Sequence, residues 1–271
     1  MKRKLTCLES IYQSTMDKIS FCVLLVIAAV SMTDAQEQKS YVGIKGGISI
    51  PNLTSGGSQE NPLNTGYSSR LGPDFAIYYE KPITKIFSLM PSLEYSSQGG
   101  KKNGFQAFPT PDEFAAMFPP GQAPTYLYAD FNSEAKMNYL MLGVLAKFTW
   151  PLSRSLFSIY ADVGPFGALL VSAHQVTSGS SMIYADPGMQ QPLTQSPQSF
   201  DDTQDIKSDL HKGNLGVQGD LGIALNVTSG RVFLEGGGNY GFINIQNDGA
   251  DGENHTGAAT IRIGYAYRLG K

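Results

Sequence analysis

The chain has 271 residues, with 16% charged side chains, 11% aromatic side chains and 30 glycines. This length and composition favour one large all-β domain with many turns over a helical enzyme. The net charge of −3 argues against a nucleic-acid partner, which would need a basic patch.

The first element is an apolar run over residues 19–32, which is short for a membrane-spanning helix. Thr33 and Ala35 supply small residues at positions −3 and −1 of a cleavage site. We therefore expect residues 1–35 to be a cleaved signal peptide, and residues 36–40 to be a short periplasmic N-terminus. An uncleaved anchor is the alternative.

The same leader contains both cysteines, Cys7 and Cys22, so the mature chain is expected to lack disulfides. Met16 is an alternative start of this leader, since the residues before it are unusual for one. Residues 41–271 remain as the folded domain.

Eight segments of this domain alternate between apolar and polar side chains, and a period of two predicts β-strands with one apolar face. The segments are residues 41–50, 71–81, 87–98, 137–150, 156–174, 214–226, 231–243 and 257–269. Their lengths suit transmembrane strands, which need roughly 9–11 residues.

The connections between these segments alternate between short and long. The short ones are residues 82–86, 151–155 and 227–230, and the long ones are residues 51–70, 99–136, 175–211 and 244–256. Short turns at one end and long loops at the other are typical of an outer-membrane barrel. The pattern predicts an eight-stranded antiparallel up-and-down transmembrane β-barrel with both termini in the periplasm.

A soluble barrel of the lipocalin type also has eight alternating strands, but its apolar face points inward. The polar face here carries ten charged residues: Lys45, Asp74, Glu80, Glu94, Lys147, Asp162, Asp220, Glu235, Arg262 and Arg268. A base facing mid-bilayer lipid costs about 2–4 kcal/mol, so in a membrane barrel these side chains must point inward.

Aromatic residues on the apolar face gather beside the short turns, where one interfacial girdle should lie. These residues are Tyr79, Phe87, Trp150, Phe157 and Tyr267. We expect outer-membrane lipid to contact them.

Five stretches carry a family resemblance: YVGIKGGISIPNL, MPSLEYSSQGGKK, NYLMLGVLAKFTW, YADVGPFGALL and IRIGYAYRL. They resemble the PorT-like outer-membrane β-barrel family of Gram-negative bacteria, over nearly the whole mature chain. The resemblance implies an eight-stranded barrel in the outer membrane. Some members of that family serve protein secretion, and most have no assigned role.

Five of the charged residues fall on consecutive strands around the closed barrel: Glu235, Arg262, Lys45, Asp74 and Glu94. A short turn at residues 82–86 permits a register that brings Asp74 and Glu94 opposite each other, where they require cations. We expect an internal ion network that blocks the interior, because eight strands enclose only enough space for side chains. The alternative is that each charge is solvated separately.

No catalytic motif or cofactor signature is recognisable, and the sequence predicts neither an enzyme nor a metal site. The three histidines, His174, His211 and His255, lie at strand ends or in loops, where solvation is the simpler interpretation.

The loop over residues 99–136 is rich in aromatics and contains an expected helix start, with Thr110 as cap and Pro111 as first residue. The aromatics are Phe105, Phe108, Phe114, Phe118, Tyr126 and Tyr128. They either pack on one another or form a binding surface.

We expect a monomer with a structural or interaction role, exerted without catalysis through the external loops or the periplasmic rim. A component of a protein-secretion machinery and a narrow pore for ions or small solutes are the alternatives.

Overall fold

A computed structural model describes residues 39–56, 62–153, 155–247 and 252–270. The expected signal peptide, residues 1–35, lies outside the described residues, as does most of the segment 36–40. Among the residues that are described, no helix combines the length and apolar character required to cross a membrane.

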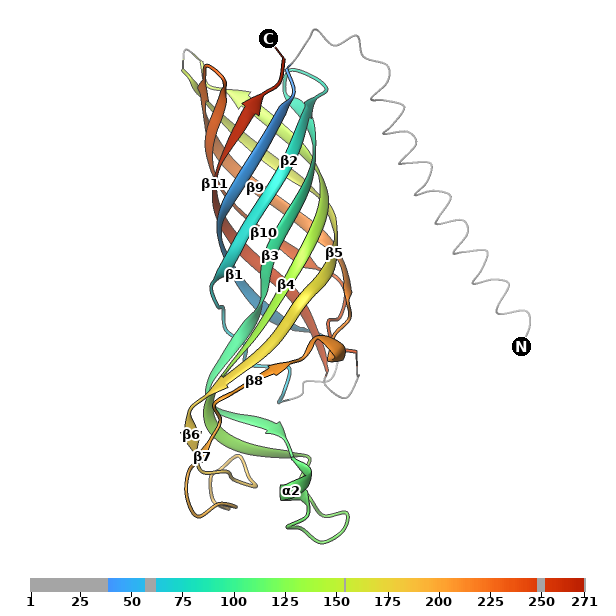
Figure 1. Cartoon of the computed structure of the whole chain (residues 1–271), viewed down its shortest axis with the longest axis vertical. Helices are drawn as coiled ribbons and strands as arrows, with labels where there is room; N and C mark the ends of the chain where they lie inside the picture. The colour runs from blue at the N-terminus through green and yellow to red at the C-terminus, as the bar shows by residue number, and fades with distance from the viewer. Residues whose placement is uncertain (1–38, 57–61, 154, 248–251, 271) are drawn as a thin grey trace, which may run out of the picture.

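Eight long strands form the body of the molecule (Figure 1). They are β1 (Tyr41–Gly56), β2 (Gly72–Pro82), β3 (Phe87–Pro109), β4 (Tyr126–Pro151), β5 (Phe157–Ser178), β9 (Gly213–Val227), β10 (Gly230–Gly241) and β11 (Glu253–Arg268). Each pairs antiparallel with its neighbours, and the pairings β1–β11 and β4–β5 complete the ring. The predicted all-β, up-and-down, eight-stranded barrel is therefore confirmed.

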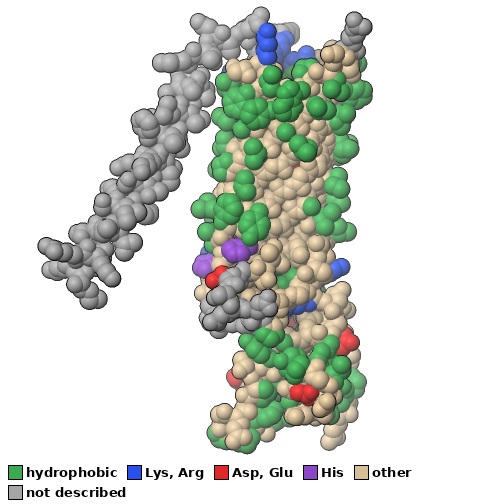
Figure 2. All heavy atoms as spheres, turned by 180° about the vertical axis from the view of Figure 1, so that it is seen from behind, with side chains coloured by type: hydrophobic (Ala, Val, Ile, Leu, Met, Phe, Trp, Pro, Cys, Tyr) green, Lys and Arg blue, Asp and Glu red, His purple; other side chains and the backbone are tan. Residues whose placement is uncertain are grey.

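The two faces of the strands are sorted as the alternation predicts. Leu142, on the outer face of β4, is 64% exposed, whereas nine of the ten charged residues on the polar face are buried. The tenth, Arg268, is half-buried at the end of β11. Figure 2 shows apolar side chains over the outside of the barrel, with the visible charged side chains gathered near its ends. An apolar exterior around a charged interior excludes the lipocalin arrangement.

The prediction that residues 99–136 form a loop is wrong for most of that range. Strands β3 and β4 remain paired from Gly99 and Lys136 as far as Pro109 and Tyr126. The extension leaves the barrel and projects from the end opposite the C-terminus (Figure 1). The apolar and polar residues of 99–109 do not alternate, so the period of two that identifies the barrel strands is absent there.

The other predicted long loops also contain regular structure. Strand β1 extends to Gly56, β5 extends to Ser178, and β11 begins at Glu253. The connection between β5 and β9 adds four short elements: β6 (Ser180–Ser181), β7 (Gln198–Ser199), β8 (Asp202–Asp205) and the 3-10 helix η1 (Lys207–Asp209). Strand β8 pairs with the end of β5, so this connection is folded.

The expected helix in the β3–β4 connection is present as one turn, α2 (Asp112–Ala115). Its predicted cap is wrong, because Pro111 occupies the N-cap position and no side chain caps the helix. The hydroxyl of Thr110 instead donates a hydrogen bond to the carbonyl oxygen of Pro124 across the connection.

Replacing Leu142 with Arg places a charge on the outer face of a membrane-crossing strand. We expect Leu142→Arg to lower the free energy of unfolding by about 2–4 kcal/mol in lipid bilayers. Met117→Arg is the control, because Met117 is equally exposed at 65% but lies in the β3–β4 connection. Denaturant titration in vesicles measures both, and equal losses would contradict the membrane assignment of β4.

Candidate functional site

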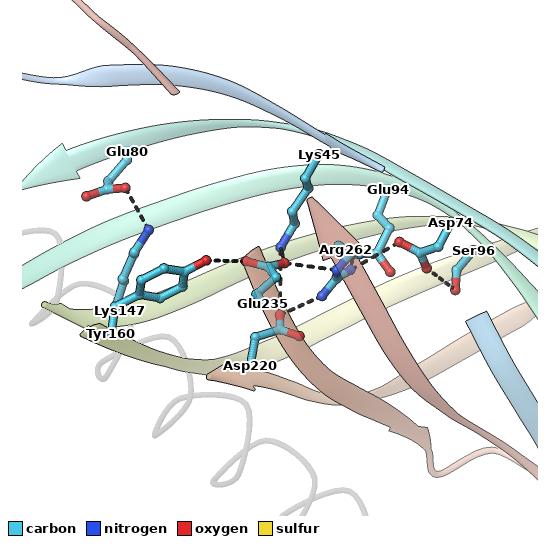
Figure 3. Close-up of polar contacts among 10 residues, drawn as sticks. All are labelled: Lys45, Asp74, Glu80, Glu94, Ser96, Lys147, Tyr160, Asp220, Glu235 and Arg262. Atoms are coloured by element: carbon cyan, nitrogen blue, oxygen red, sulfur yellow. Dashed lines mark hydrogen bonds and ion pairs between the residues drawn. The ribbon is translucent and has the colours of Figure 1, made fainter. Parts of the chain in front are cut away.

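Arg262 of β11 is the centre of a group of buried charges inside the barrel (Figure 3). One guanidinium nitrogen lies 3.2 Å from Asp74 and 2.9 Å from Glu94. The second lies 2.6 Å from Asp220, and Nε lies 2.9 Å from Glu235. A single cation therefore contacts carboxylates from four strands, β2, β3, β9 and β10.

Lys45 of β1 is the second cation of this group. Its Nζ lies 2.7 Å from Glu235 and 3.7 Å from Asp220. The hydroxyl of Tyr160 donates a hydrogen bond of 2.7 Å to the other oxygen of Glu235. The structure thus brings together all five residues selected from the sequence, and adds Asp220. We call these six residues the ion cluster: Lys45, Asp74, Glu94, Asp220, Glu235 and Arg262.

The expected register between β2 and β3 is wrong by two residues. Asp74 lies opposite Ser96, and Glu94 lies opposite Ala76. Ser96 donates a hydrogen bond to Asp74, and Arg262 contacts both carboxylates, so they share a cation without being direct cross-strand partners. The two-residue shift preserves the inward orientation of every side chain, because alternation has a period of two.

A smaller ion group lies towards the short turns. Glu80 of β2 contacts Lys147 at 3.2 Å and Arg231 at 2.6 Å, and the Arg231 guanidinium stacks 3.9 Å from the ring centroid of Tyr41. Arg231 was not among the residues predicted to face inward. Its separation from Glu235 by an even number of residues was the available signal, since both then share one face of β10.

Apolar side chains inside the barrel lie on both sides of the ion cluster. Towards the short turns they are Tyr78, Met90, Leu145, Tyr160, Ala224, Phe233 and Ala266. Towards the projecting end they include Leu53, Met137, Tyr139, Met141, Phe166 and Leu170. Alternation identifies the charged part of this interior, but it does not identify these apolar side chains, because a membrane barrel does not require inward residues to be polar.

Glycines make room for the aromatic rings of the interior. Tyr78 lies opposite Gly43, and Tyr160 lies opposite Gly222. A Cβ added at either glycine would lie 2.2 Å from Cζ of the facing tyrosine, so each ring occupies the space that a side chain would take. These close approaches allow large rings inside a narrow barrel.

The extensions of β3, β4 and β5, together with β6–β8, form a folded unit that we call the projection, residues 99–136 and 176–205. It has its own buried side chains, Leu127, Ala129, Phe131 and Ile183. Phe131 stacks on Phe200 with ring centroids 4.5 Å apart. Three of the six aromatic residues singled out in this loop have ring contacts within it, as Phe105 stacks on Tyr128 and Phe108 packs on Phe131.

Lys102 of β3 anchors the segment that follows β1 to the base of the projection. Its ammonium donates hydrogen bonds to the carbonyl oxygens of Pro62 and Leu63 and lies 4.5 Å from the ring centroid of Tyr67. Burial lowers the pKa of Lys102 to about 8. In the connection between β1 and β2, Arg70 forms an ion pair of 2.7 Å with Glu134 of β4.

A family profile described as "Outer membrane protein beta-barrel domain" matches residues 34–247. The chain belongs to this family. It is accordingly an outer-membrane β-barrel protein of the Gram-negative type, and the long connections lie at one end of the barrel.

Solved outer-membrane barrels resemble the chain at low identity. Ail of Yersinia pestis is 10% identical with a TM-score of 0.34, and the match covers 85% of this chain and 100% of Ail. OprG of Pseudomonas aeruginosa is 11% identical with a TM-score of 0.37, covering 87% and 100%. Neisserial surface protein A is 13% identical with a TM-score of 0.35, covering 84% and 99%. The comparison with curated proteins gave no match.

The aromatic residues expected to form a girdle all lie on the outer face near the short turns: Tyr79, Phe87, Trp150, Phe157 and Tyr267. All are exposed except Phe87, which is half-buried and packs on Phe148 with ring centroids 5.4 Å apart. Tyr79 and Tyr267 both lie opposite Val42, on either side of β1. Contact between these rings and the lipid interface remains a prediction.

The three histidines are far apart in the chain and make separate contacts. Nδ1 of His211 lies 2.8 Å from the carbonyl oxygen of Asn244. His174 lies opposite Asp205 where β5 pairs with β8, and the ring of His255 stacks on Tyr240.

Removing the central cation should destabilise the barrel, because the buried carboxylates around it lose their partner. We expect Arg262→Ala to lower the free energy of unfolding by about 3–5 kcal/mol, because uncompensated buried charges remain. Lys212→Ala, at an exposed position in the β5–β9 connection, should change it little. Denaturant unfolding in detergent micelles compares the two, and similar midpoints would show that the ion cluster does not stabilise the barrel.

Proposed function

We propose that this outer-membrane barrel is a closed scaffold whose projection binds another macromolecule outside the cell. The observation that carries the proposal is the continuation of β3, β4 and β5 beyond the barrel into a unit with its own core. A role without catalysis fits this reading.

The length of the projection argues for a use beyond connecting strands. Elsewhere the barrel joins β9 to β10 across only Thr228 and Ser229. Ordering residues 99–136 instead costs backbone entropy of about 1–2 kcal/mol per residue, which pairing and packing must offset. Binding residues are often carried on segments that a rigid scaffold positions.

The interior supports a closed barrel over the alternative of a narrow pore. The ion cluster lies between two groups of apolar side chains, so permeating ions would meet both fixed charges and dry layers. An eight-stranded barrel is only wide enough for its side chains to fill it.

A PorT-like role in protein secretion is the second alternative, and it would place the partner at the periplasmic rim. The short turns at that rim contain few residues, whereas the projection offers the larger surface. Met117 and Met189, which are 65% and 54% exposed, add apolar contact area on the projection.

Deleting the outer part of the projection tests its binding role. In this variant an Asn-Gly turn replaces residues 104–131 and joins the register partners Asn103 and Asn132. We expect the barrel still to fold, because no barrel ladder is cut, and to show heat-modifiable mobility in gels. Proteins that cross-link to the wild-type barrel in intact cells should be lost.

The matched control replaces the periplasmic turn, residues 83–86, with Asn-Gly, and should retain the cross-linked partner. The proposal fails if the partner remains after deletion of the projection and is lost from the turn variant. That result would favour the secretion alternative.

Planar bilayers test whether the barrel is closed. We expect no steady single-channel current from the purified wild-type protein, because the ion cluster and its apolar neighbours occupy the interior. Reproducible conductance at constant voltage would contradict the closed barrel and support the pore.

A further inference from the structure

We propose that the barrel interior binds one divalent cation of the calcium type between Asp162, Asp220 and Glu235. These residues come from β5, β9 and β10, which are consecutive around the ring. One carboxylate oxygen from each lies within 4.8 Å of the others, and all three side chains are buried. This inference goes beyond the proposed binding role and does not depend on it.

Strand pairing forces two of these carboxylates together. Asp162 and Asp220 are direct register partners on β5 and β9, and both point into the barrel. Like charges directly opposite each other on neighbouring strands are destabilising. Burial strengthens the repulsion, because the surroundings screen charge less than water does.

Among the described residues, the side chains around this pair leave most of its carboxylate oxygens without a hydrogen-bond partner. Asp162 is only 4% exposed, yet neither of its carboxylate oxygens has a hydrogen-bond partner among the described residues. Oδ1 of Asp220 is also unpartnered there. Buried polar atoms are nearly always satisfied in native proteins, so three unpartnered oxygens at one place point to a ligand that binds there.

The cation on the neighbouring strand β4 is directed elsewhere. Lys147 of β4 is the register partner of Asp162, but its ammonium contacts Glu80 at 3.2 Å and lies 4.0 Å from the ring centroid of Tyr160. Arg262 and Lys45 approach Asp220 and Glu235, and the described residues show no ion pair from either to Asp162.

With all buried acids and bases ionised, the charge balance of the interior matches a divalent ligand. From the short turns to the ion cluster, the buried carboxylates outnumber the buried cations by two. The carboxylates are Asp74, Glu80, Glu94, Asp162, Asp220 and Glu235, and the cations are Lys45, Lys147, Arg231 and Arg262. One divalent ion cancels the excess where the orphaned oxygens lie.

The donor set selects the kind of ion. All three ligands are carboxylates, and hard oxygen donors suit calcium, which accepts irregular geometry and bidentate carboxylates at about 2.3–2.6 Å. Magnesium demands a near-octahedral shell and retains several waters, for which a barrel filled with side chains has little room. Asp162 can offer both oxygens, Asp220 offers Oδ1, and Glu235 offers a remaining lone pair.

The route into the site determines how the test is made. The apolar groups on either side would hinder an ion from entering the folded barrel, so loading should occur during folding. The full mature chain is therefore refolded into detergent in calcium chloride or in EDTA, passed over a chelating resin, and analysed for metal by mass spectrometry.

We expect stoichiometric calcium in protein refolded with the ion, none in protein refolded in EDTA, and a higher unfolding midpoint for the loaded form. Asp162→Asn should abolish both the retained calcium and the midpoint difference. Asp130→Asn, an exposed change in the projection, should alter neither.

Two results would overturn the proposal. One is wild-type protein that folds in calcium but retains no metal after the resin, which needs no variant to fold. The other is Asp162→Asn protein that unfolds at a higher midpoint than the wild type in EDTA and in calcium alike. That outcome would mean that removing one charge relieves the repulsion between Asp162 and Asp220 better than any bound metal does.

Discussion

The pairing between β1 and β11 is the constraint on which the barrel depends. It runs from Tyr41 opposite Arg268 to Gly56 opposite Glu253, along the whole length of β1. Without it, two sheet edges would present unpaired amide and carbonyl groups to hydrocarbon, where each costs several kcal/mol. The same seam carries Lys45 and Arg262 inward, so closure of the ring also assembles the two cations of the ion cluster.

The barrel could be predicted from the sequence because the lipid-facing side of each strand must be apolar, whereas the charged side chains must lie on the opposite side. Leu142 must face outward and Lys147 inward, and this requirement repeats along every membrane-crossing segment. The order of the strands follows from the short turns, and it places Glu235, Arg262, Lys45, Asp74 and Glu94 on neighbouring strands. The sequence does not show as directly that these five residues lie at the same depth. Alternation fixes the face of a residue, but it leaves the strand register free to shift in steps of two.

Sequence reasoning missed the features where the division into an apolar outer face and a charged inner face ends. Residues 99–109 extend β3 out of the barrel (Figure 1), and no apolar outer face marks them as a strand. Met90 and Leu145 point inward although they are apolar, because an interior without water accepts either kind of side chain. Arg231 was overlooked because it stands at the start of its strand, next to the turn.

The continuity of β3 and β4 has a mechanical consequence. Each strand runs unbroken from the short turns into the projection, and within the barrel each is paired on both sides. A force that pulls the tip away from the membrane would act along these strands and load many ladder hydrogen bonds at once in shear. Such an attachment resists pulling far better than a loop, whose bonds would break one at a time.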